Sequence, residues 1–171
     1  MLEFKTPQIE DKAWVDQCFK HLKTMNCDYT FGNMFVWSTE YSTKICRFKD
    51  FFICSWGMGK ETNFGIPVGK GDFKEAVEEV IKYAKANDIM PRFYGVTEAY
   101  VEMLNENFPD AFQFLYDESY GDYIYEVEKM ASLKGKKYHG KRNHITNFKK
   151  NNPNWSFETI NKDNIDDCIN L

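Results

Sequence analysis

Residues 66–87 read Ile66-Pro-Val-Gly-Lys-Gly-Asp-Phe-Lys-Glu-Ala-Val-Glu-Glu-Val-Ile-Lys-Tyr-Ala-Lys-Ala-Asn87. They predict the end of a strand, a glycine turn and a helix in direct succession. Asp72 is placed to cap the helix, and Glu75, three residues later, is its expected capping-box partner. The apolar side chains recur at the helical period, at Phe73, Val77, Val80, Ile81 and Ala84. The pattern predicts a helix over residues 73–87 with one apolar face.

Upstream of this turn, the sequence predicts two helices and then three strands. Apolar residues at i, i+4 and i+8 indicate helices over residues 11–23 and 29–41. Runs rich in apolar and β-branched residues, separated by turns, indicate the strands. The expected strands are 44–49, 51–56 and 63–68, with Asp50 at a tight turn between the first two.

Downstream, a short strand is expected over residues 92–96, followed by a helix over 98–108 that Thr97 caps. Alternating aromatic residues then predict a hairpin-like strand pair, 112–116 and 123–127. The predicted order is helix, helix, three strands, helix, strand, helix and two strands. That order indicates a mixed α/β fold with the turn at residues 69–72 in its middle.

After Glu128 the composition becomes basic, which looks like a boundary. Residues 129–157 contain eight Lys or Arg and no acid, whereas the rest of the chain has 14 basic and 26 acidic residues, a net charge of −12. This asymmetry favours an anionic ligand, with a phosphate-bearing one as the first candidate. The alternative is a solvated helix face that only keeps the protein in solution. The eight are Lys129, Lys134, Lys136, Lys137, Lys141, Arg142, Lys149 and Lys150.

The basic residues lie around a predicted helix that ends at Asn151-Asn-Pro153. Its apolar side is formed by Tyr138, Ile145 and Phe148, and the opposite sides carry Lys137, Lys141, Arg142, Lys149 and Lys150. Lys149 and Lys150 are explained by the partial negative charge at a helix C-terminus.

Five residues are the candidates for anion binding. Lys141 and Arg142 could hold phosphates, arginine as a bidentate fork and lysine as a point charge. Lys137 adds a further positive charge, and Asn143 offers donors and acceptors to a carbonyl or a ribose. Tyr138 could stack on a base, although packing on the apolar side is the simpler role. His139 and His144 are either surface residues or a general base, and no pattern selects between them.

The C-terminal residues predict a strand over 155–160 and a helix over 164–171. A domain rarely ends by opening a strand and a helix with nothing left to pack on them. We therefore expect the chain to be the first part of a longer protein. An incomplete second sheet would also favour a homodimer.

The bulk composition indicates a globular, cytoplasmic protein. Of 171 residues, 43% are hydrophobic and 17% aromatic. The N-terminus has no basic leader, and no window approaches a membrane span of about 18 apolar residues. Five cysteines show no CxxC pair, and Cys18 with His21 makes only half of a zinc pattern. We expect neither disulfides nor a metal.

Four segments carry a resemblance to a known family. They are Asp28-Tyr-Thr-Phe-Gly-Asn-Met-Phe-Val-Trp37, residues 66–72, Asp122-Tyr-Ile-Tyr125 and Gly135-Lys-Lys-Tyr-His-Gly-Lys-Arg-Asn-His-Ile-Thr-Asn-Phe148. Together they resemble a bacterial family grouped with the C-terminal domain of phosphatidylglycerol lysyltransferases, more distantly related to the Fem peptidyltransferases. The resemblance implies two GNAT-like acyltransferase domains joined by a helix. It places the first domain at residues 1–130, the basic connector helix at 131–152 and the start of a second domain at 153–171.

The resemblance implies transfer of an acyl or aminoacyl group from acyl-CoA or aminoacyl-tRNA. GNAT domains bind pyrophosphate on the backbone of a glycine loop, and Gly69, Lys70 and Gly71 stand at that position. They depart from the usual Gln/Arg-x-x-Gly-x-Gly/Ala pattern, and Asp72 adds a negative charge there. A glycine turn that leads into a capped helix is the alternative explanation.

GNAT-type transfer needs no Ser or Cys nucleophile, because the acceptor amine attacks the carbonyl directly. No catalytic residue is therefore assigned. Three hypotheses remain open: a transferase, a non-catalytic module that binds RNA or acidic lipid headgroups, and an inactive fragment of a longer enzyme.

Overall fold

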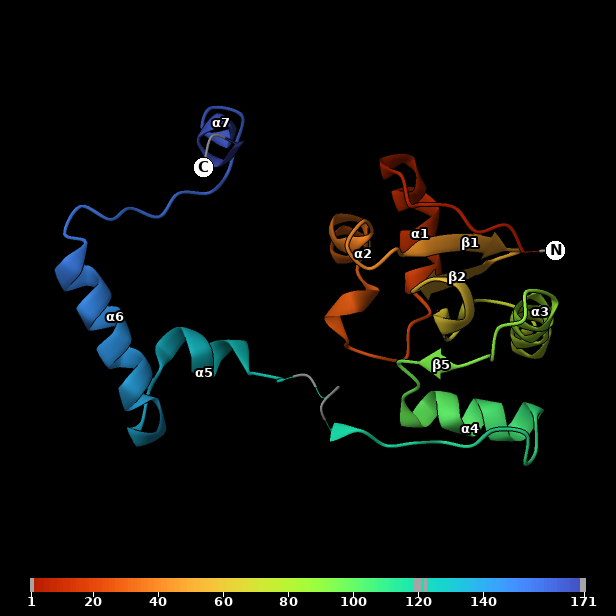
Figure 1. Cartoon of the computed structure of the whole chain (residues 1–171). Coiled ribbons are helices and arrows are strands. Elements are labelled where there is room, and N and C mark those ends of the chain that lie inside the picture. Colours follow the sequence, from red (N-terminus) through yellow and green to blue (C-terminus); the bar gives the residue numbers. More distant parts are fainter. Residues whose placement is uncertain (1, 119–120, 122, 170–171) are drawn as a thin grey trace. The chain divides into compact units, whose positions relative to one another are not determined.

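The computed structural model describes residues 2–118, 121 and 123–169. The chain forms two compact units, Met1–Tyr120 and Gly121–Leu171. Figure 1 shows a sheet with surrounding helices in the first unit, and helices joined by extended chain in the second.

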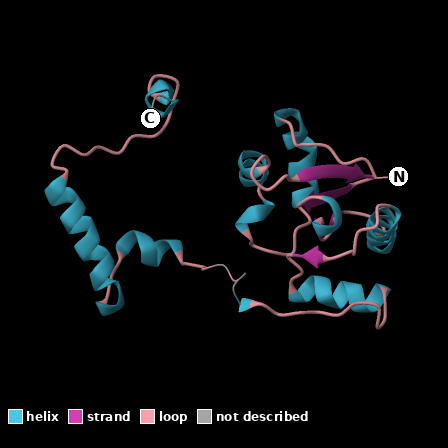
Figure 2. Ribbon diagram, viewed as in Figure 1, coloured by secondary structure: helices cyan, strands magenta, loops and turns pink. Residues whose placement is uncertain are grey.

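The first unit is built on a mixed five-stranded sheet (Figure 2). Its path is β1–β2–β3–β5, and β4 pairs with β2 beside β3. All the pairs are antiparallel except β3 with β5, which are parallel. The strands are β1 (Lys44–Phe48), β2 (Phe51–Trp56), β3 (Asn63–Gly65), β4 (Val68–Gly69) and β5 (Phe93–Tyr94).

The predicted strand over residues 63–68 is split into β3 and β4. Both β3 and β4 pair with β2 in the antiparallel sense, so the chain runs along β2 in one direction from β3 to β4. Pro67 lies in the gap, and a proline has no N–H to donate to a strand ladder. The strand predicted over 92–96 forms, but only as the two residues of β5.

Helix α3 (Phe73–Ala86) connects β4 to β5 and forms the crossover that a parallel strand pair requires. Its predicted N-cap is confirmed, since Asp72 Oδ1 accepts a hydrogen bond from the Glu75 backbone N–H at 3.0 Å. The reciprocal part of the predicted capping box is not found. The Glu75 carboxylate instead accepts from Lys49 Nζ, with 2.6 Å to Oε1.

The other predicted helices of this unit are present but shorter than expected. The first of them ends at Phe19, and residues 27–29 form a 3-10 turn. The Thr30 hydroxyl then caps the next helix by accepting a hydrogen bond from the Asn33 N–H at 3.3 Å. The bounds are η1 (Ile9–Asp11), α1 (Lys12–Phe19), η2 (Cys27–Tyr29), α2 (Phe31–Trp37), η3 (Gly59–Glu61) and α4 (Glu98–Asn107).

Apolar side chains are buried in two clusters. Strand β2 contributes Phe51 and Phe52 to one cluster and Ile53 to the other. Because successive strand side chains point to opposite faces, these residues bury both faces of β2. Helix α3 contributes to both, through Val77 and Val80. Helix α3 therefore joins the two clusters.

The predicted strand pair 112–116 and 123–127 is wrong. Residues 111–117 and 123–126 are not in strands, and residues 119, 120 and 122 lie outside the described part of the chain. Phe112 packs on Phe93 and Phe108 through its ring, whereas Leu115 is 86% exposed. Alternating aromatics give a high strand propensity, but a strand forms only beside a partner edge.

The second unit is helical over its described residues. It contains α5 (Val127–Ser132), η5 (Lys136–Tyr138), α6 (His139–Asn151) and α7 (Ile165–Ile169). The strand predicted over 155–160 is wrong, because residues 155–160 have no regular structure and Phe157 is 87% exposed. Within the described range, α7 is shorter than the predicted helix, and residues 170–171 fall outside that range.

Candidate functional site

The basic residues predicted to bind an anion lie on α5, η5 and α6. We call residues 129–150 the basic segment. Leu133, the C-cap residue of α5, has a left-handed φ of 47°, and Gly135 with φ 95° then turns the chain into η5. Leu133 is the one buried residue in the described part of this unit. The α5–α6 corner therefore depends on polar contacts more than on an apolar core.

Arg142 makes those contacts. Its Nη1 donates hydrogen bonds to the carbonyl oxygens of Leu133 and Gly135, the latter at 2.9 Å. Both bonds use the same nitrogen, so the edge formed by Nε and Nη2 makes no hydrogen bond recorded among the described residues. Arg142 thus fixes the turn and keeps one guanidinium edge for another acceptor.

Lys141 and Lys149 stand four residues before and after Ile145 on α6. Residues four apart share a helix face, so these lysines flank the apolar side instead of lying opposite to it, which corrects the sequence-based prediction. Lys141 Nζ lies 5.9 Å from the centre of the Tyr125 ring, and Lys149 Nζ lies 5.3 Å from that of Trp155. Ammonium groups and exposed aromatic rings therefore form one mixed surface.

The remaining predicted residues lie at the start of α6. Lys137 Nζ is 5.9 Å from the centre of the half-buried Tyr138 ring. The exposed Asn143 side chain lies against His139, with 3.2 Å between Nδ2 and Nε2. This pair occupies one of the histidine nitrogens.

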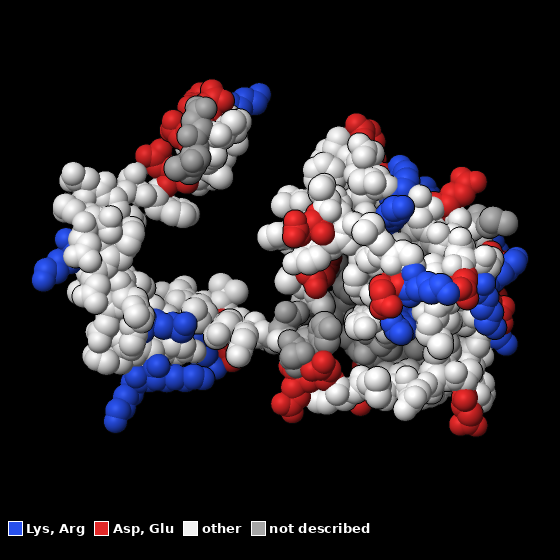
Figure 3. Space-filling model, in the orientation of Figure 1, with Lys and Arg blue, Asp and Glu red and all other residues white. Residues whose placement is uncertain are grey.

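Few acidic groups pair with the basic residues of the basic segment. Of its basic residues, Lys129 alone makes a salt bridge among the residues described, to Glu126 at 2.5 Å. Asp166 and Asp167 lie in the first turn of α7, whereas Glu126 and Glu128 lie at the start of α5. Figure 3 shows red side chains on α7 and blue side chains along α6. An unpaired cluster of one sign attracts a polyanion.

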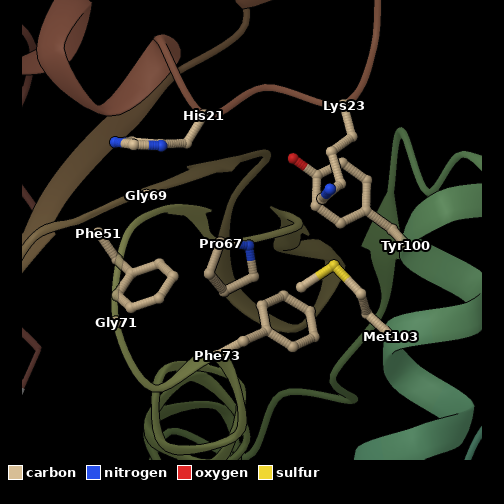
Figure 4. Close-up of a pocket in the computed structure, with 9 residues that line it drawn as sticks. All are labelled: His21, Lys23, Phe51, Pro67, Gly69, Gly71, Phe73, Tyr100 and Met103. Carbon is tan, nitrogen blue, oxygen red and sulfur yellow. The ribbon is translucent and has the colours of Figure 1, made fainter.

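The predicted glycine loop borders a pocket of about 70 Å³ in the first unit (Figure 4). A Cβ at Gly69 would lie 2.1 Å from the Asp50 carbonyl oxygen, and Gly71 has a φ of 136° that favours glycine. Backbone geometry thus accounts for both glycines. Lys70 is exposed and does not line the pocket.

The pocket also contains residues that the sequence did not single out. Lys23 and His21 come from the loop after α1, and Tyr100 comes from α4. The sequence predicts Tyr100 only as an inward-facing helix residue. No spacing rule could have joined Tyr100 to His21 and Lys23, which lie far from it in the chain.

Of the five cysteines, Cys27 and Cys168 are exposed, and the others are buried or partly buried. Burial raises the pKa of the Cys54 thiol to about 12, so this cysteine stays protonated and weakly nucleophilic. No group of three or more His, Cys, Asp or Glu gathers in the described ranges. Nor is any helix in them long and apolar enough to cross a membrane.

The fold and the basic segment define a mixed α/β protein with an attached cationic helical unit. The family model for the C-terminal domain of phosphatidylglycerol lysyltransferase matches residues 19–171, so the chain belongs to this family. None of the curated proteins matches.

A crystal structure of a conserved protein of unknown function from Bacteroides thetaiotaomicron is similar, with a TM-score of 0.83 and 31% sequence identity. The match covers 99% of this chain and 57% of the Bacteroides chain.

Proposed function

We propose that the chain is a GNAT-like aminoacyl or acyl transferase. It would move an acyl or aminoacyl group from a phosphate-bearing donor, aminoacyl-tRNA or acyl-CoA, to an amine or hydroxyl acceptor. Membership of the lysyltransferase family supports this proposal, as does the order of helices and strands around the parallel β3–β5 pair. We also propose that residues 1–130 form the first GNAT-like domain and that residues 153–171 begin a second.

One observation carries the proposal, namely the unpaired lysines and exposed aromatic rings along the basic segment. Lys137 and Lys141 would contact donor phosphates, while the free edge of Arg142 would bind one phosphate as a fork. Tyr138 would stack on a base, and Asn143 would meet a ribose or carbonyl. Lysine charges interleaved with aromatic rings are typical of surfaces that bind single-stranded nucleic acid.

The chemical step would need positioning more than covalent catalysis. The lone pair of the acceptor nitrogen or oxygen attacks the acyl carbonyl, and a tetrahedral oxyanion forms. The bond from the acyl carbon to the donor's ribose oxygen or thiol sulfur then breaks, and the proton lost by the acceptor ends on the released hydroxyl or thiol. Bringing the two substrates together supplies much of the rate enhancement. Donor anchoring by the basic segment would be the contribution of the residues described above.

Fluorescence anisotropy of labelled tRNA, titrated at several salt concentrations, tests donor binding. We expect saturable binding whose affinity falls steeply with salt, because each phosphate contact releases counterions. Lys141→Glu with Lys149→Glu should weaken binding by at least about tenfold and reduce the salt slope. Lys20→Glu with Lys85→Glu changes the net charge equally on the first unit and serves as the control. An equal loss of tRNA affinity in the two double variants would show that the basic segment does not bind the donor.

A second candidate is a non-catalytic module that binds RNA or acidic lipid headgroups. The glycine loop favours it, because backbone geometry accounts for Gly69 and Gly71 and the Asp72 carboxylate is used as a helix cap. Steady turnover of an acyl donor, measured with a radiolabelled acyl group, separates the two candidates. Binding without turnover supports the module.

A further inference from the structure

The turn between α5 and α6 concentrates charge of one sign. We call residues 133–138 the corner turn, and Figure 1 shows α5 and α6 joined there. Residues 129–157 contain no acid, and the basic residues of the turn, with the arginine that contacts it, make no salt bridge among the described residues. Like charges held close together repel, so the charge of the turn opposes its fold. These residues are Lys134, Lys136, Lys137 and Arg142.

Little apolar packing compensates for this repulsion. Leu133 is 8% exposed, and it is the one buried residue in the described part of this unit. Its φ of 47° is left-handed, which costs energy for a residue that has a Cβ. Helix α5 has six residues, too few for a helix to be stable by itself. The corner turn therefore depends on the side chain that ties it to α6.

Arg142 is that side chain. Its Nη1 donates hydrogen bonds to the carbonyl oxygens of Leu133 and Gly135. Both acceptors are neutral, so the guanidinium keeps its whole charge. The edge formed by Nε and Nη2 makes no hydrogen bond recorded among the described residues, and its two parallel N–H groups match two oxygens of one phosphate. One guanidinium thus holds the corner turn and presents an edge to a phosphate.

A phosphate on that edge acts on the corner turn in two ways. It fixes the guanidinium, whose rotamer freedom otherwise weakens the two bonds to the carbonyls. It also brings negative charge among the cations of the turn and reduces their repulsion. Because coupling between two equilibria is reciprocal, a ligand that favours the closed turn must bind the closed turn more tightly by the same factor.

We propose that the corner turn is a ligand-coupled element, in which a phosphate group bound by Arg142 closes the turn and fixes the angle between α5 and α6. This inference rests on the proposed function, because it takes the phosphate from the donor that the basic segment is proposed to bind. The phosphate belongs either to an RNA backbone or to the pyrophosphate of CoA, and the experiment separates these sources.

Amide hydrogen exchange of the full chain, alone and with saturating deacylated tRNA or CoA, tests the coupling. We expect exchange in residues 133–138 to slow by at least about tenfold on binding, with α3 unchanged. Protection by tRNA alone identifies the RNA backbone as the source, and protection by CoA identifies its pyrophosphate. Anisotropy with tRNA and calorimetry with CoA measure binding independently. Binding without protection overturns the inference and leaves the proposed function standing, whereas binding of neither ligand overturns both.

Two variants separate affinity from coupling. Arg142→Lys keeps the charge but lacks the fork, so saturating tRNA should give no protection of the corner turn. Lys149→Met removes a charge from the far end of α6, and it should weaken tRNA binding yet give parent-like protection at saturation. Equal protection in Arg142→Lys and the parent would show that charge alone closes the turn, which contradicts the role of Arg142.

A pair of glycines tests the coupling from the other direction. A Cβ would meet nothing within 4 Å at Gly135 or at Gly140, but only Gly135 of this pair has a positive φ, of 95°. Gly135→Ala therefore strains the turn without removing any charge. We expect it to speed exchange in the turn and to weaken tRNA binding by at least about threefold. Gly140→Ala should bind at least as tightly as the parent. Faster exchange with parent-like affinity in Gly135→Ala would rule out the coupling.

Discussion

At the residue scale, Asp11 shows how one buried carboxylate is kept charged. Its side chain is 6% exposed and accepts hydrogen bonds from Lys5 Nζ at 2.7 Å, Gln8 N–H at 2.9 Å and Trp14 Nε1 at 2.9 Å. Desolvation alone would raise the pKa of Asp11, but the bonds from Lys5, Trp14 and Gln8 outweigh it and lower that pKa below the ordinary value of 3.8. The N-terminal segment and α1 are joined at this carboxylate.

Asp11→Asn should therefore destabilise the protein in a pH-dependent way. A carboxylate with a lowered folded pKa stabilises the protein above its ordinary pKa, and this stability is lost as the pH falls through the folded pKa. We expect a loss of about 1–3 kcal/mol at neutral pH that shrinks in the acid range. Urea unfolding at stepped pH measures it, with Asp16→Asn as the exposed control. A loss that stays constant with pH would contradict this account.

Two glycines offer a second residue-scale prediction with opposite signs. Gly69→Ala should destabilise the protein by more than about 2 kcal/mol, because its Cβ would overlap the Asp50 backbone. Gly32 lies in α2, and a Cβ added there would have no neighbour within 4 Å, so Gly32→Ala should stabilise by about 0.5–1 kcal/mol. Chemical denaturation of both variants gives the comparison. Equal changes in the free energy of unfolding would mean that the backbone around Gly69 moves to make room for the added Cβ at no cost.

At the element scale, helices with local signals were predicted well. The cap at Asp72 and the apolar stripe that follows it lie within one segment, and α3 ends one residue from its predicted end. The strands expected at 112–116, 123–127 and 155–160 failed because a strand depends on a distant partner edge, which local alternation does not report. Residues 127–132 form α5 instead.

The α5–α6 corner gives an element-scale prediction. Arg142→Met removes both hydrogen bonds to the turn, and we expect amide exchange in residues 133–138 to speed up by about tenfold or more. Arg142→Lys should not rescue it, because an ammonium lacks the planar fork. Exchange in α3 should stay unchanged and serves as the internal reference. Slow exchange at the turn in Arg142→Met would show that Leu133 alone holds the corner.

At the scale of the whole molecule, the second unit exposes large apolar side chains. Tyr123 is 88% exposed, Phe157 87% and Ile169 72%, and exposed apolar surface of this extent favours association. We expect a second copy of the chain to cover it, and sedimentation velocity should show a concentration-dependent dimer. Phe157→Ser with Ile169→Ser should shift the protein toward monomer, whereas Met25→Ser on the first unit should not. A monomer at every concentration would rule out this pairing.

The order of residues along the chain was enough to establish helices such as α3 and α4, the charge asymmetry and the family. Caps, helical periods and charge runs are short-range features, so α3, α4 and the basic residues of α6 could be located from them directly. Packing settled the rest. It assigned the Arg142 guanidinium to two carbonyls, placed the Lys141 ammonium beside the Tyr125 ring, and brought Tyr100 together with Lys23 beside the turn into α3. These relations depend on how separate segments pack, which no spacing along one chain encodes.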